Sequence, residues 1–216
     1  EMFLKIKNIP RVSWSSDLPL NLKPKISTFF FLCFGLTLFG LGEGLLIVSA
    51  SGASPWSVLA QGLFLNIGFS VGIITIFISI AVLLLWYPLN QKPGIGTILN
   101  ALIIGLMIDV CIRYVPTPES FVFQILLGAL AVLIVGIGGG IYLVANLGAG
   151  PRDGLMIGLQ KKTNLPIAVV RGVLEITVMS IGWYLGGTVG FGTLLFAFGI
   201  GPCVALGLYL VNKLFN

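Results

Sequence analysis

The sequence contains no histidine and few charged residues of any kind. Only 9% of its 216 residues are Asp, Glu, Lys or Arg, whereas about a quarter are charged in ordinary soluble domains. Without histidine, the chain cannot form a Ser-His-Asp or Cys-His nucleophilic site, or use imidazole to bind a metal or carry protons. The three cysteines, an odd number, all lie in apolar segments and predict neither a disulfide framework nor a metal site. We therefore expect no catalytic residue, no metal, no cofactor and no enzymatic activity.

Apolar residues make up 57% of the chain, and the mean hydropathy is +1.08. Several apolar runs reach the roughly 20 residues that a helix needs to cross a bilayer. The sequence thus predicts a multi-pass protein whose main partner is the lipid bilayer, and we place it in the inner (plasma) membrane of a bacterium.

The formal net charge is +5, and five basic residues precede the first long apolar run: Lys5, Lys7, Arg11, Lys23 and Lys25. Basic residues beside a membrane segment mark its cytoplasmic side. We interpret them as a membrane flank that places the N-terminus in the cytoplasm, and we expect no nucleic-acid partner.

The chain divides into an arm and one membrane domain. Residues 1–28 are polar and contain three prolines; we expect an irregular cytoplasmic arm that is not a cleaved signal, with Trp14 at the membrane interface. Two segments are too short to cross a bilayer: Pro55–Asn66 and Pro151–Gln160. The predicted spans are Phe29–Val48, Val71–Leu89, Gly94–Cys111, Phe121–Val144, Ile167–Leu185 and Phe191–Leu214.

The strongest signal is an internal repeat. A shift of 96 residues without gaps superposes the first membrane repeat, residues 29–115, on the second, residues 116–216. Shared apolar bias would match Leu with Ile, but it would not keep Gly, Pro and Thr in one register. The matches include Gly40 with Gly136, Gly52 with Gly148, Pro55 with Pro151, Gly94 with Gly190 and Thr97 with Thr193.

The symmetry of the repeat depends on whether the short segments cross the membrane. Four crossings per repeat would leave the two copies parallel, whereas three would invert the second copy. Loop charges favour three crossings by one residue only, so segment length decides. The predicted fold is all-α, with six spans and two short re-entrant half-helices in inverted repeats.

Each short segment begins with a Gly-rich turn and a proline, a combination that suits the first turn of a helix. Helix N-termini carry free N–H groups and favour anions, and in inverted-repeat transporters they meet near the bilayer midplane. The alternative is that the turns only permit tight packing, and that Asp153 caps its own helix and pairs with Arg152. The predicted substrate-binding residues are Gly52, Ser54, Pro55, Gly148, Gly150, Pro151, Arg152 and Asp153.

Four further charged residues lie in apolar segments and are candidates for ion coupling or gating: Glu43, Asp109, Arg171 and Glu175. Glu43 is the better candidate, because Asp109 falls near the end of a span and could be interfacial. Arg171 and Glu175 are spaced i, i+4 and face the same side of a helix. A structural ion pair at a helix end would explain them equally well.

The second repeat resembles the YczE/YyaS/YitT group of bacterial integral membrane proteins. The resemblance is carried by Gly148–Leu155, Gly158-Leu159, Arg171, Glu175, Gly182-Trp183, Gly186-Gly187 and Gly190–Thr193, and it extends over most of the chain after residue 28. It implies a polytopic, transporter-like protein of the bacterial inner membrane. In that group an Asp often follows the Pro-Trp pair of the first repeat, where this chain has Ser57.

Two functions are compatible with these features. The first is a transporter or channel for a small anionic or zwitterionic solute, bound between the two Gly-Pro turns. The second is a non-transporting structural or regulatory subunit of a larger membrane complex, or a homo-oligomer, in which glycine-rich helix faces are docking surfaces.

Overall fold

The computed structural model describes residues 9–215, and every regular element within that range is helical. Six helices are long and apolar enough to cross a membrane, which confirms the predicted all-α, multi-span fold. They are α1 (Ile26–Val48), α3 (Val71–Trp86, extended by the 3-10 turn η2, Tyr87–Leu89), α4 (Ile95–Tyr114), α5 (Phe121–Ala145), α7 (Ile167–Tyr184) and α8 (Phe191–Phe215). The other two, α2 (Pro55–Ile67) and α6 (Pro151–Thr163), have 13 residues each. Such a helix is about 20 Å long, less than the hydrocarbon thickness of a bilayer.

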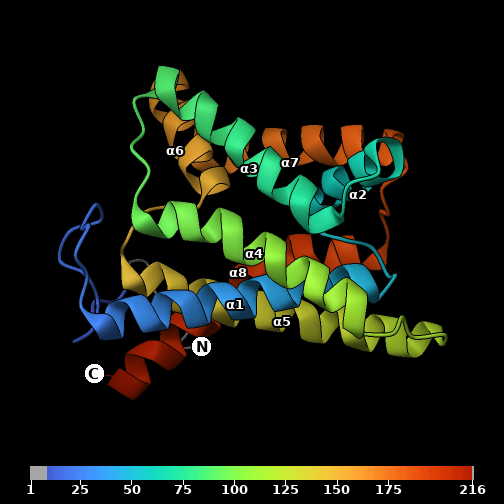
Figure 1. The fold of residues 1–216 in the computed structure, drawn as a ribbon, viewed down its shortest axis with the longest axis horizontal. Helices are drawn as coiled ribbons and strands as arrows, with labels where there is room; N and C mark the ends of the chain where they lie inside the picture. Colours follow the sequence, from blue (N-terminus) through green and yellow to red (C-terminus); the bar gives the residue numbers. More distant parts are fainter. Residues whose placement is uncertain (1–8, 216) are drawn as a thin grey trace.

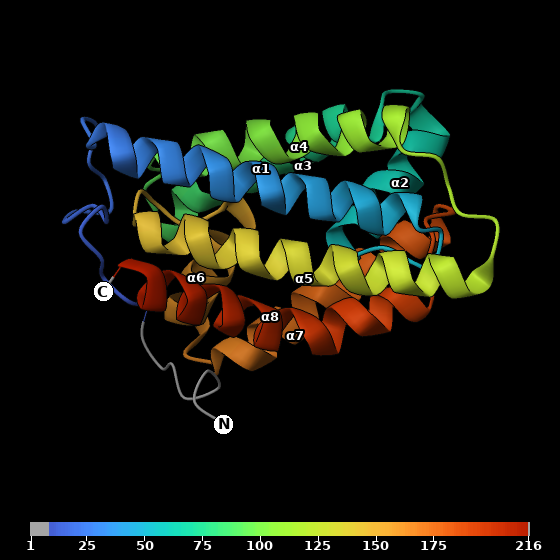
Figure 2. The same ribbon diagram turned by 90° about the horizontal axis from the view of Figure 1, so that it is seen from below.

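The helices form two layers (Figure 1). In one layer α1 packs against α5, α4 flanks α1, and α8 flanks α5; Figure 2 shows this layer from below. The other layer holds α3, α7 and the two short helices, with α2 packed mainly on α7 and α6 mainly on α3. Each half of the chain therefore covers the short helix of the other half.

Small residues bring α1 and α5 into close contact, as the glycine-rich faces predict. A Cβ atom on Gly35 would lie 2.7 Å from the backbone nitrogen of Tyr142, and one on Gly42 would lie 2.6 Å from a side-chain carbon of Val135. No larger residue fits at either position with the helices at this separation.

The two halves follow one backbone plan. Pro55 and Pro151, Val71 and Ile167, and Ile95 and Phe191 begin corresponding helices, 96 residues apart in each case. All residues of the described chain with positive φ fall into pairs with the same spacing: 50 and 146, 52 and 148, 68 and 164, 90 and 186. In Figure 1, α1 and α4 run from left to right, whereas α5 and α8 run from right to left. This regularity is what an inverted duplication predicts.

The N-terminal arm packs onto the end of the helix layer. Trp14 is only 3% exposed and stacks on Phe31 with 4.5 Å between ring centroids. The hydroxyl of Thr28 donates to the carbonyl of Trp14, and the Ser16 N–H donates to the carbonyl of Ala145. The ring of Trp14 packs between α1 and the end of α8, and its position at the membrane interface stays a prediction. Lys5 and Lys7 lie outside the described residues.

Candidate functional site

Both short helices begin near the middle of the molecule and run toward opposite ends (Figures 1 and 2). The turns before them contain Gly52 and Gly148, whose φ values are +121° and +112°. A Cβ atom on Gly52 would lie 2.6 Å from the Gly190 nitrogen, and one on Gly148 would lie 2.8 Å from Thr97 Oγ1. Glycine is therefore required at both positions by conformation and by space. Pro55 and Pro151 occupy the first helical positions, as predicted.

Two Gly-x-Gly-Thr motifs, residues 94–97 and 190–193, anchor these turns. In the first motif, the Gly96 N–H donates to the Leu147 carbonyl (2.8 Å), and Thr97 Oγ1 donates to the Ala149 carbonyl (2.7 Å). In the second, the Gly192 N–H donates to the Ser51 carbonyl (2.8 Å). Each turn is thus held by the last spanning helix of the other half, α4 or α8.

The start of α2 is bound to an internal carboxylate. Glu43 of α1 is 1% exposed, and its Oε2 accepts hydrogen bonds from Ser54 Oγ (2.6 Å) and Ser57 Oγ (2.7 Å). Its other oxygen, Oε1, is buried and has no hydrogen-bond partner among the described residues. The negative charge predicted for a ligand at this helix start is thus supplied, in part, by the protein.

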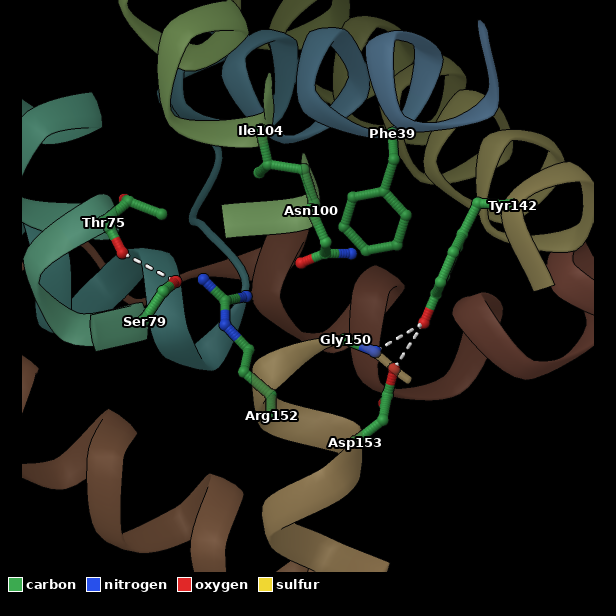
Figure 3. A pocket seen from close by; sticks show the side chains of 9 residues that line it. All are labelled: Phe39, Thr75, Ser79, Asn100, Ile104, Tyr142, Gly150, Arg152 and Asp153. Atoms are coloured by element: carbon green, nitrogen blue, oxygen red, sulfur yellow. Dashed lines mark hydrogen bonds between the residues drawn. The ribbon is translucent and has the colours of Figure 1, made fainter. Parts of the chain in front are cut away.

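The start of α6 also has a carboxylate. At α2 the carboxylate comes from a spanning helix, whereas at α6 it comes from the short helix itself. Asp153 Oδ2 accepts from the hydroxyl of Tyr142 on α5 (2.7 Å). The Tyr142 hydroxyl oxygen in turn accepts from the Gly150 N–H (3.3 Å; Figure 3). Asp153 occupies the position equivalent to Ser57. Its observed partner is Tyr142, which the sequence reasoning missed; a lone tyrosine in a glycine-rich span was the available signal.

Arg152 lies between the two helix starts. Its Cζ is 5.2 Å from the centre of the Trp56 ring, and these two residues are themselves 96 positions apart. Glu43, Asp153 and Glu175 are within its electrostatic range. Arg152 makes no hydrogen bond and no ion pair with any other residue of 9–215. The one ion pair between residues of that range joins Arg171 and Glu175. Arg152 is thus a cation in the membrane domain that a carboxylate does not directly contact.

Two cavities meet at Arg152. The smaller, about 60 Å³, is also lined by Ser79, Asn100 and Tyr142, and Figure 3 shows the guanidinium group pointing into it. The larger, about 240 Å³, is lined by residues of α1, α2, α5, α6, α7 and α8. Its polar wall consists of Glu43, Ser54, Trp56, Arg152, Asp153, Arg171 and Glu175, and its apolar wall includes Phe39, Phe196, Ile200 and Val204.

The structure brings together most of the predicted site residues. Gly150 lines the smaller cavity, and Arg171 and Glu175 form an ion pair with 2.8 Å between Nε and Oε1 on the wall of the larger one. Asp109 lines neither cavity. Its carboxylate accepts hydrogen bonds from the hydroxyl of Ser70 and from the Gly72 N–H, and so holds the start of α3.

Comparison with known proteins gives the chain its family. A protein of Haemophilus influenzae, described as uncharacterized, is 39% identical over 210 residues, which are 97% of this chain and 95% of that protein. The uncharacterized membrane protein YczE of Bacillus subtilis is 37% identical over 173 residues, 79% of each chain. YyaS of the same organism is 27% identical over 165 residues, 74% of this chain and 82% of YyaS. No solved structure matches the chain.

The family match covers all the spanning helices up to the last turns of α8. Residues 26–208 match the family of unknown function DUF6198, and the relatives confirm the resemblance to YczE and YyaS drawn from the glycine motifs. This chain belongs to the family of unknown function DUF6198.

Proposed function

We propose that this protein is a transporter or channel that carries a small solute with a negatively charged group across the bacterial inner membrane. The observation that carries the proposal is the unpaired guanidinium of Arg152, which faces two cavities where the two short helices begin. Charges inside membrane domains are costly and usually mark the path of an ion or solute. A bound anionic group would supply the partner that Arg152 lacks.

The arrangement of the short helices supports an inverted repeat around this site. Trp56 and Arg152 are equivalent positions of the two halves, and they contact each other. A residue can contact its own counterpart only where both lie near the axis relating the two copies. The solute site is thus proposed on that axis, close to the bilayer midplane, where transporters of this design bind their substrates.

A difference between the two halves supports a carrier with two alternating states. In the first half α3 packs closely on α4, and a Cβ atom on Gly72 would overlap the carbonyl oxygen of Gly105. In the second half α7 and α8 barely touch within the described chain, and the space around Gly201, the counterpart of Gly105, is open. Exchanging these two arrangements would close the cavity on one side and open it on the other.

Uptake into proteoliposomes tests the proposal. The purified protein is reconstituted and offered radiolabelled phosphate, sulfate, acetate and the proteinogenic L-amino acids. We expect one class to accumulate, and Arg152→Gln to reduce its uptake at least about tenfold, since a charged hydrogen bond is lost. Arg113→Gln, the same substitution on the exposed end of α4, is the matched control and should transport normally. No uptake of any compound, or normal uptake by Arg152→Gln, would contradict the proposal.

One observation favours the second candidate, a structural or regulatory subunit. Only Val170 and Gly182 of α7 are buried, and Gly172 on the same helix faces open space, so α7 offers a free surface for another membrane helix. Purification from native membranes distinguishes the two. A stoichiometric partner protein bound through α7 would support the subunit role, whereas recovery of the chain alone, or of copies of it, would count against it.

A further inference from the structure

We infer that the solute is a small amino-acid-like zwitterion, whose carboxylate meets Arg152 and Trp56 and whose primary ammonium group meets Glu43. The inference rests on the proposed function, because it concerns the larger of the two cavities at Arg152. It adds the positive end of the solute, for which the Gly-Pro turns alone give no evidence.

The negative end is assigned by two donors without acceptors. Trp56 is only 6% exposed and lines the cavity, and its Nε1–H is buried with no hydrogen-bond partner among the described residues. The guanidinium of Arg152 stacks over the same indole. Arg has five N–H donors and Trp has one, and neither can accept. Both side chains line the cavity, and between them they offer donors and no acceptor, which suits a carboxylate.

The positive end is assigned by an acceptor without a donor. Only 1% of Glu43 is exposed. Its Oε2 accepts hydrogen bonds from two serine hydroxyls, whereas its Oε1 has no hydrogen-bond partner among the described residues. A buried carboxylate oxygen without a donor is costly. Arg152 is within electrostatic range of Glu43 but does not hydrogen-bond to it. The missing group is therefore a donor with positive charge and N–H bonds, which excludes a trimethylammonium group.

The formal charges of the cavity separate a zwitterion from a simple anion. Its lining contains three carboxylates, Glu43, Asp153 and Glu175, and two guanidinium groups, Arg152 and Arg171, so three negative and two positive charges leave one net negative charge. A simple anion would increase that imbalance. A simple cation would leave the donors of Arg152 and Trp56 unsatisfied. A zwitterion satisfies both ends and leaves the net charge unchanged.

The size of the cavity and its apolar lining limit the rest of the molecule. A volume of about 240 Å³ is below the range of roughly 300–1,000 Å³ typical of drug-sized ligands. The apolar part of its lining includes Phe39, Phe196, Ile200 and Val204. This combination fits a single amino acid with an apolar side chain.

The test compares a zwitterion with its two singly blocked derivatives. Thermal stabilisation of the purified protein in lipid nanodiscs is measured with the proteinogenic L-amino acids, and the best stabiliser is titrated beside its N-acetyl and carboxamide derivatives. We expect the parent compound to bind at least about tenfold more tightly than either derivative, because each derivative loses one charged hydrogen-bonding group.

Two substitutions assign the ends. Glu43→Gln should weaken binding of the parent and remove its advantage over the N-acetyl derivative, while the advantage over the carboxamide remains. Arg152→Gln should do the reverse. Glu119→Gln and Arg113→Gln, the same changes at exposed positions outside the cavity, should leave both advantages intact. If a variant does not fold, Glu43→Asp and Arg152→Lys, which keep the charge, serve as milder versions with smaller shifts expected.

The outcomes distinguish the inference from the proposed function. Stabilisation by acetate or phosphate but by no amino acid would overturn the zwitterion and leave the proposed function standing. Equal binding of the parent and its N-acetyl derivative would overturn the role of Glu43. Absence of binding by every compound, together with absence of uptake in proteoliposomes, would overturn both. The comparison of the parent with its two derivatives uses the unmodified protein. It therefore tests the zwitterion even if no variant folds.

Discussion

The contact between α3 and α6 gives a prediction about stability that can be worked out from one pair of residues. Trp86 is 3% exposed, and its Nε1–H donates to the Pro151 carbonyl (2.9 Å). Its ring covers Gly154 so closely that a Cβ atom there would overlap the indole carbons. At the equivalent contact in the other half, Gly182 of α7 meets the backbone of Val58 and Leu59 on α2. One pair of helices is thus spaced by an indole, and the other has direct backbone contact.

The expected energies follow from this geometry. Gly154→Val forces a branched side chain against the ring and should cost about 1–3 kcal/mol through overpacking. Trp86→Ala removes a buried indole and should cost about 3–5 kcal/mol. In the double variant the ring is absent, so the valine meets no obstacle and fills part of the space. The double variant should therefore be no less stable than Trp86→Ala alone, with a coupling of about 1–3 kcal/mol between the two sites.

Unfolding in mixed micelles with increasing SDS, followed by far-ultraviolet circular dichroism, measures these energies without relying on the fluorescence of the removed tryptophan. Gly172→Val is the control, because nothing lies within 4 Å of a Cβ atom at that position; it should change the unfolding free energy by less than about 0.5 kcal/mol. The reasoning is refuted if Gly154→Val costs as much in the Trp86→Ala background as in the unmodified protein.

Three further predictions concern other parts of the molecule. Trp14→Ala should lower the unfolding free energy by about 3 kcal/mol in the same assay, because it empties the contact with Phe31. Asp109→Ala should lower it by about 1–2 kcal/mol, the cost of losing a helix cap, without changing solute affinity. In intact cells a membrane-impermeant maleimide should label Pro116→Cys but not Lys162→Cys; the opposite pattern would contradict the proposed cytoplasmic N-terminus.

The sequence was informative about the outline of the fold because length and glycine pattern carry that information. The two Pro-initiated segments were predicted as helices too short to span, and the structure gives both 13 residues. Gly52 and Gly148 were singled out as turn residues, and both have positive φ. These features depend on local backbone conformation, which a single sequence reveals.

The contacts between polar side chains were not predictable in the same way. In a membrane helix the lipid-facing and buried sides are both apolar, so hydropathy does not show which side faces a neighbour. The lone tyrosine of its span singles out Tyr142 but does not name Asp153 as its partner. Nothing in the sequence indicates that Glu43 meets two serines of α2, or that Asp109 meets Ser70. The packing of Trp14 on Phe31 was not foreseen for a related reason: a tryptophan flanking a span fits the membrane interface and a packed helix end equally well.

The exchange of short helices between the halves also sets an order of events during synthesis. α2 packs mainly on α7, which begins 100 residues after α2 ends (167 − 67). On the ribosome, therefore, α2 emerges long before its main cover exists, whereas α6 finds α3 already made. A nascent chain that stops after α4 leaves α2 without the helix that buries it, and we expect such a fragment to be degraded. The halves are consequently not two folding units. The first half completes its assembly only when the last third of the chain, which contains α7, has been translated.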